Sequence, residues 1–79
     1  MQAYILMNTE PISSREVAEV TRKVEGIKMA HRVTGQFDVV AYTEFTKMDD
    51  LGKIIGEIQK IKGITRTQTA IAIPSIVKE

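Results

Sequence analysis

Two polar clusters carry most of the binding chemistry that this sequence offers. Residues 34–38 (TGQFD) combine a glycine, whose small size leaves backbone N–H groups approachable, with the carboxylate of Asp38. Thr65, Thr67 and Thr69 are spaced by two, which would place three hydroxyls on one face of a strand. Together the clusters would supply donors for a carboxylate and an acceptor for an ammonium group, the minimum for binding a zwitterion.

Judged from the residue types alone, a purely structural role for each cluster is as well supported as a role in ligand binding. Threonine is β-branched and is common in strands whatever its function. The carboxylate of Asp38, beside a tight connection, could simply bond to nearby backbone N–H groups. Both interpretations therefore stay open at this point.

Catalytic and metal-binding chemistry is poorly represented. His31 is the only histidine, and it lies in an alternating segment without a nucleophile beside it, so it is interpreted as a strand residue. The sequence contains no cysteine, which excludes thiol nucleophiles, disulfides, thiolate zinc sites and iron–sulfur clusters. Asp49 and Asp50 are interpreted as acids that stabilise a helix N-terminus rather than as metal ligands. We expect no catalytic residue, no metal and no cofactor.

Composition narrows the range of partners. The 79 residues carry 11 Lys and Arg against 10 Asp and Glu, which disfavours a direct nucleic-acid partner because phosphate binding calls for a basic excess. No apolar run approaches the roughly 18 residues of a membrane span, and residues 1–9 do not resemble a signal peptide. The sequence predicts one cytoplasmic domain over residues 1–79, with no membrane partner.

Hydrophobic periodicity predicts the element order β-α-β-β-α-β. Strands are expected at 3–7, 27–34, 37–45 and 64–73, and the middle two form a hairpin because their link is too short for a crossover helix. Ser13 and Glu16 fit a capping box that would begin the first helix. On that helix Val17, Val20 and Val24 would share one buried face.

The second helix is expected to begin near residues 46–49 and has the clearest apolar face, formed by Leu51, Ile54, Ile55, Ile58 and Ile61. Gly26 and Gly63 follow the two helices at equivalent positions of a weak internal repeat. Gly52 and Gly56 would let a neighbouring element approach the second helix closely. The order matches the ferredoxin-like α+β fold, a four-stranded antiparallel sheet with both helices on one face.

The other face of that sheet is expected to be apolar as well. Residues 3–7 are apolar throughout, and residues 39–42 and 70–73 are apolar without alternation. A second copy packed face to face would cover such a surface, so the sequence predicts a dimer formed through the sheets.

These elements carry a family resemblance. Residues 33–40 (VTGQFDVV) resemble the V-x-G-x-[YF]-D signature of the Lrp/AsnC family effector domain, also called the RAM domain. Residues 61–71 (IKGITRTQTAI) are similar to its closing L-x-G-V-x-x-T-x-T-x-[IV] segment. The resemblance extends over residues 3–73 in the same order and spacing.

The resemblance implies an amino-acid-binding regulatory module that acts in transcriptional regulation of amino-acid metabolism. It implies a dimeric α/β barrel whose dimers commonly join into rings of eight or ten subunits, with the effector bound between dimers. Because the sequence begins at the first strand, we expect a stand-alone module without a helix-turn-helix, which could assemble with full-length Lrp/AsnC-type regulators. The effector-binding residues that the family motifs indicate are Gly35, Gln36, Phe37, Asp38, Thr67 and Thr69.

Other functions fit the same element order. An ACT-type module also binds amino acids, although residues 35–38 favour the RAM domain. A small dimeric α/β-barrel enzyme, a cofactor-independent monooxygenase or isomerase, would act in the cavity between sheet and helices, where only Tyr42 and His31 could contribute. An RNA-binding RRM needs aromatic stacking residues on its central strands, and residues 37–45 do not match that motif.

Overall fold

The computed structural model describes residues 1–74, which follow the order βαββαβ. The strands are β1 (Gln2–Thr9), β2 (Ile27–Arg32), β3 (Val39–Glu44) and β4 (Ile64–Ile71), and the helices are α1 (Ser14–Arg22) and α2 (Met48–Gln59). The predicted fold class and element order are confirmed. Residues 75–79, which follow the last expected strand and are interpreted from the sequence as a short tail, lie outside the described residues.

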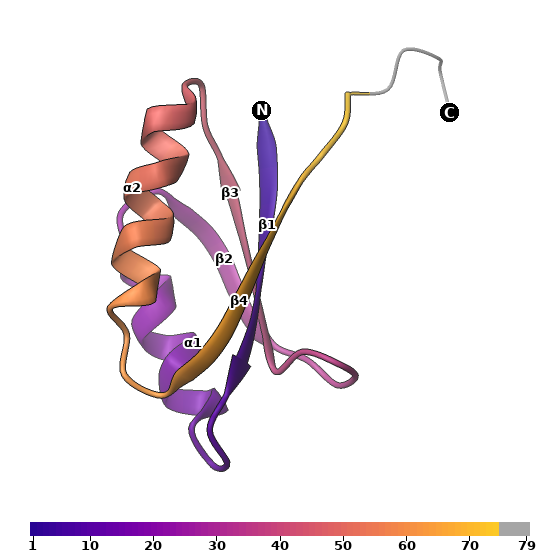
Figure 1. The fold of residues 1–79 in the computed structure, drawn as a ribbon, viewed down its shortest axis with the longest axis vertical. Coiled ribbons are helices and arrows are strands. Elements are labelled where there is room, and N and C mark those ends of the chain that lie inside the picture. The colour runs from indigo at the N-terminus through magenta and orange to yellow at the C-terminus, as the bar shows by residue number, and fades with distance from the viewer. Residues whose placement is uncertain (75–79) are drawn as a thin grey trace.

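The four strands form one antiparallel sheet in the order β2-β3-β1-β4, and both helices lie on the same side of it (Figure 1). Strand β1 is central, so Ile5 pairs with Ala41 of β3 on one side and with Thr69 of β4 on the other. The hairpin predicted for β2 and β3 is confirmed. Within residues 1–74, neither helix has the length and apolar character needed to cross a membrane.

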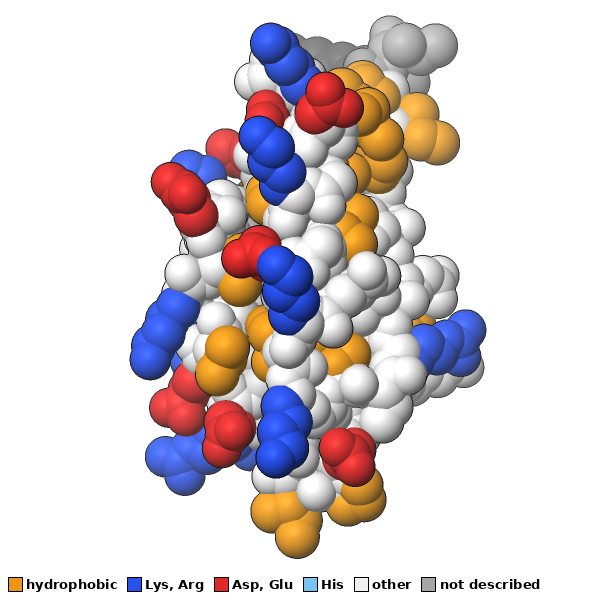
Figure 2. All heavy atoms as spheres, turned by 60° about the vertical axis from the view of Figure 1, so that its left-hand side comes forward, with side chains coloured by type: hydrophobic (Ala, Val, Ile, Leu, Met, Phe, Trp, Pro, Cys, Tyr) orange, Lys and Arg blue, Asp and Glu red, His pale blue; other side chains and the backbone are white. Residues whose placement is uncertain are grey.

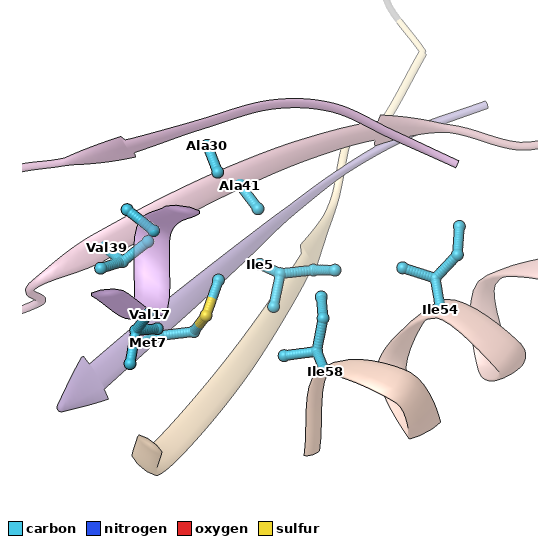
Figure 3. Packing of buried hydrophobic residues seen from close by; sticks show 9 residues of the cluster. Ile5, Met7, Val17, Ala30, Val39, Ala41, Ile54 and Ile58 are labelled. Carbon is cyan, nitrogen blue, oxygen red and sulfur yellow. The ribbon is translucent and has the colours of Figure 1, made fainter. Parts of the chain in front are cut away.

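The core lies between the sheet and the helices. Alternate residues of β1 and β3 point toward the helices, which buries Ile5 and Met7 beside Val39. The helices contribute Val17 from α1 and Ile58 from α2, both fully buried in the same cluster (Figure 3). The apolar face predicted for the second helix is therefore confirmed.

Helix α1 departs from the prediction in two places. Ser13 is the N-cap, but its backbone is helical (φ −93°, ψ −8°) and its side chain makes no capping hydrogen bond, so the capping box with Glu16 is wrong. Val20 is 38% exposed, because the buried face of the helix runs through Val17, Ala18 and Thr21 instead.

Gly26 is required for the turn between α1 and β2. Its φ is +98°, a backbone conformation that side chains with a Cβ rarely adopt. A Cβ at this position would also stand 2.7 Å from Cδ1 of Ile54, so the glycine lets the turn approach α2.

Gly52 and Gly56 make no such approach. A Cβ at either position would meet no atom of the chain within 4 Å. The expectation that another element of the same chain packs closely against these glycines is therefore wrong, and both face open space.

The sheet face opposite the helices has an apolar centre. Tyr4 and Leu6 of β1 lie beside their partners Tyr42 and Val40 of β3, and the ring centroids of the two tyrosines are 5.2 Å apart. Tyr4 is 42% exposed. The face that the sequence marked as apolar is thus an open apolar surface on the single chain.

Candidate functional site

The loop between β2 and β3 is anchored to the end of β1. The side-chain amide of Asn8 donates to the carbonyl oxygen of Gln36 at 2.7 Å. The backbone N–H of Asp38 donates to the carbonyl oxygen of Met7 at 2.8 Å. These bonds hold the loop in one position beyond the strands, on the side away from the helices (Figure 1).

Asp38 contributes a further bond to this anchor. Its Oδ2 accepts from the backbone N–H of Thr9 at 2.8 Å, and its backbone carbonyl accepts from the N–H of Val33 at 2.9 Å. One carboxylate oxygen is therefore engaged by the fold. Of the two roles left open for Asp38, the structure supports the turn-forming one.

The tip of the loop is open. Gly35 has a φ of +117°, and no atom lies within 4 Å of the place where a Cβ would stand. Gly35 and Gln36 are exposed, and Phe37 is half-buried. A fixed backbone with a free surface suits recognition of an anionic group by N–H donors.

The threonines of β4 form a shorter row than the sequence suggested. Thr67 and Thr69 are half-buried and pair with Met7 and Ile5, whose side chains face the helices, so both hydroxyls share that face. A register shift between Asn8 and Thr9 leaves Thr65 without a partner on β1. The expectation of three aligned hydroxyls is wrong, because this bulge interrupts the alternation.

The loop and the threonines flank β1 from opposite sides. Asp38 bonds to Met7 from the β3 side, and Thr67 pairs with Met7 from the β4 side. Two strand spacings separate them, about 10 Å. Neither cluster lines the groove between α1 and α2 or the smaller pocket beside β2, so within one copy the two clusters are separate.

The residues suggested for an enzyme lie elsewhere. Tyr42 and His31 pair with neighbours on the open sheet face and not in the space between sheet and helices, which the core fills. The Tyr42 hydroxyl donates to Glu44 at 3.0 Å, and partial desolvation together with this carboxylate raises the pKa of the Tyr42 phenol. Residues 1–74 contain no cluster of three or more acidic or imidazole side chains suited to a metal ion.

Sequence reasoning missed Asn8 and Thr9. Both lie beyond the strand expected at 3–7, yet the structure includes them in β1, where they hold the β2–β3 loop through a side-chain amide and a backbone N–H. An Asn at a strand end is a common turn former, so its type alone did not indicate a bond to residue 36.

Residues 2–79 match the family model of the Lrp/AsnC ligand binding domain. An uncharacterized HTH-type transcriptional regulator of Pyrococcus furiosus is 30% identical over 81 residues, which cover 98% of this chain and 54% of that protein. The chain thus spans about half the length of the curated relatives it matches.

Solved structures show the same fold. A hypothetical protein of Pyrococcus horikoshii superposes with a TM-score of 0.82 at 36% identity, covering 95% of this chain and 92% of that one. A transcriptional regulator of Neisseria meningitidis, crystallised as a complex with L-Met, gives a TM-score of 0.79 at 21% identity over 98% of this chain and 52% of that one. The chain belongs to the Lrp/AsnC ligand-binding domain family.

Proposed function

We propose that this chain is an amino-acid-binding module of the Lrp/AsnC type that acts in transcriptional regulation of amino-acid metabolism. The observation that carries the proposal is the β2–β3 loop, which is fixed to β1 by Asn8 and Asp38 while its tip at Gly35 stays open. A loop held in place before binding loses little entropy when a ligand arrives. Family membership and the L-Met complex of the similar Neisseria regulator support an amino acid as the ligand.

The site is completed between copies. The loop and the threonine pair lie on opposite sides of β1, so a loop of one copy must meet the threonines of another, or each must meet a further surface, to enclose a small ligand. The open face around Tyr4 and Leu6 supplies a contact for a face-to-face dimer. Assembly of such dimers into a ring of eight or ten would bring the half-sites of different dimers together.

The residues have distinct roles in this proposal. Backbone N–H groups of Gly35, Gln36 and Phe37 bind the carboxylate of the amino acid, and the hydroxyls of Thr67 and Thr69 contact it from β4. Asp38 holds the loop through Thr9 and contributes to binding by that positioning.

Calorimetry and thermal denaturation with each of the twenty amino acids test the proposal. A ligand present at 100 times its Kd adds about 2.7 kcal/mol to the free energy of unfolding. Thr69→Val keeps the branched shape and removes one hydroxyl, so it should weaken binding by about 0.5–1.5 kcal/mol while the melting temperature without ligand is kept. Thr65→Val, at the bulge, is the matched control and should leave affinity unchanged.

If no amino acid binds or stabilises the wild-type chain, the sensor function is wrong and an assembly role replaces it. If an amino acid binds but Thr69→Val has no effect on its affinity, the amino-acid-binding function is retained and the proposed contact between the ligand and the Thr69 hydroxyl is wrong.

Assembly with full-length regulators follows from the same family membership. The curated relatives are HTH-type regulators of about twice the matched length. We expect the chain to join them through the same sheet faces, which co-purification with a full-length relative would detect.

A further inference from the structure

A groove runs along the helix layer, on the side of the molecule opposite the open sheet face. It has a volume of about 1080 Å³ and lies between the end of α1, the turn that follows it, and α2. Its apolar lining includes the exposed Val20 and the half-buried Val24 and Ile61. Figure 2 shows hydrophobic side chains on this side of the molecule between rows of charged ones.

One wall of the groove carries charges that alternate in sign. Asp50, Lys53, Glu57 and Lys60 all line it, on α2 and the residue that ends it. Their spacings are three, four and three residues, so they form one stripe along the helix. All four residues are exposed, and Glu57 and Lys60 already form an ion pair of 2.9 Å.

This stripe is complementary to itself when reversed. Read from either end it has the same spacings, and the signs are inverted at every position. A two-fold axis that crosses the stripe at the height of residue 55 along α2 would place Asp50 opposite Lys60 of a second copy and Lys53 opposite Glu57 of that copy. The symmetry repeats both pairs, giving four contacts between opposite charges, whereas a parallel arrangement would put like charges together.

We propose that the groove between α1 and α2 binds a second copy of this chain, with the two α2 helices antiparallel. Interfaces between identical copies with two-fold symmetry require a surface that is complementary to itself, and the stripe meets that requirement. The charges set the direction and register of the pair, and the apolar lining around Val20 and Ile61 supplies buried area. Gly56 lies in the wall with open space above it, which allows close helix contact.

The contact differs from the sheet-face dimer and can coexist with it. The groove lies on the helix layer, and the Tyr4–Tyr42 surface lies on the opposite face of the sheet. A chain with two separate two-fold contacts can link dimers into larger assemblies. The proposal does not depend on effector binding, so amino-acid calorimetry and the experiment below can fail independently.

Two single variants test the proposal by rescue. In a pair of Lys53→Glu chains, the new glutamate of each copy lies opposite Glu57 of the other, so the two-fold axis gives two repulsive contacts. In a pair of Glu57→Lys chains, the new lysine of each copy lies opposite Lys53 of the other, which again gives two repulsive contacts. Each variant alone should self-associate about tenfold more weakly or worse. An equimolar mixture of the two restores opposite charges at both positions, so its average mass in sedimentation velocity should return to that of the wild type.

The control is Arg15→Glu on α1, which changes the charge as Lys53→Glu does, at an exposed residue outside the groove. It should leave the mass unchanged, and circular dichroism checks that each variant is folded. Single variants with wild-type mass, or a mixture that is not rescued, would overturn the proposal. A wild type that loses no association at high salt would also contradict it.

Cross-linking gives a second, independent measurement. The chain has no cysteine, so one introduced thiol reports only its own contact. Measured along the helix, position 56 lies about 1.5 Å from the height of that axis, and position 52 lies about 4.5 Å from it. Gly56→Cys should therefore form a disulfide-linked pair on oxidation much faster than Gly52→Cys, and equal rates would contradict the axis.

Discussion

At the scale of single residues, Asp38 illustrates how the fold and the ligand can compete for one carboxylate. Its Oδ2 accepts from the N–H of Thr9, so the charge already stabilises the connection between β1 and the loop. Asp38→Asn keeps an oxygen for that bond but removes its charge, so we expect the free energy of unfolding to fall by about 0.5–1.5 kcal/mol. Amino-acid affinity, measured by calorimetry, should stay within about twofold.

Asp38→Ala is the stronger companion variant, because it removes the acceptor and leaves the N–H of Thr9 to water. It should melt lower than Asp38→Asn. The opposite pattern, with an unchanged melting temperature and lost affinity in Asp38→Asn, would show that the carboxylate contacts the ammonium group of the ligand.

Gly26 and Gly35 form a matched pair for a second test. Both have positive φ, +98° and +117°, but a Cβ at Gly26 would meet Ile54 at 2.7 Å and a Cβ at Gly35 would meet nothing within 4 Å. Gly35→Ala should cost about 1–2 kcal/mol of stability from backbone strain alone. Gly26→Ala should cost about 1–3 kcal/mol more because of overpacking, which urea denaturation would measure. Equal losses would contradict the close approach to α2.

At the scale of elements, α2 contains glycines that reduce its own helix propensity. No atom of the chain lies near Gly52 or Gly56, so alanine fits at either place. Gly52→Ala should stabilise the chain by up to about 1 kcal/mol, visible as a higher melting temperature.

Gly56→Ala should give a similar gain within one chain but weaken the antiparallel α2 contact, since its added methyl lies in the groove wall. A Gly56→Ala variant that associates as tightly as Gly52→Ala would argue against close helix packing.

The elements themselves were largely predictable from the sequence. The period of 3.6 predicts which residues of α2 face inward, and the glycines after each helix mark its end. Strands β1 and β3 are apolar without alternation, so only the structure shows which of their residues face the helices. The predictions that were wrong, the capping box at Ser13 and the row of three threonines, depend on local backbone geometry that residue types do not reveal. The backbone of Ser13 is helical and its side chain makes no capping hydrogen bond. The bulge at Thr65 arises because Thr9 pairs with Ile64, about 55 residues away along the chain, while Asn8 pairs with Arg66.

The two clusters of the candidate site were predictable from the sequence, but their positions relative to each other were not. The residue types at 34–38 and at Thr67 and Thr69 indicated donors and hydroxyls, and the structure places both groups beside Met7. No pattern along one chain could show that β1 separates them, because that separation follows from the strand order β2-β3-β1-β4.

At the scale of the whole molecule, the open sheet face should control the first step of assembly. Leu6 lies at its centre, between Val40 and Gln68. Leu6→Asp places a charge there, which would have to be desolvated without a partner in a face-to-face dimer. Light scattering should then show a mass closer to the 8.8 kDa of one chain than the wild type gives.

Gln59→Glu adds the same charge on α2, away from the sheet, and serves as the control. An unchanged mass for Leu6→Asp, with native circular dichroism, would show that the sheet faces do not pair.

The central position of β1 also bears on how quickly the chain can fold. Ala3 pairs with Ile71, so completing the sheet closes a loop of about 70 residues, at an entropic cost of about 4 kcal/mol. The β2–β3 hairpin needs no such closure, and β4 should therefore join the sheet late. A circular permutant that connects β4 to β1 by a short turn would make their pairing local, and stopped-flow refolding should be faster than for the natural order.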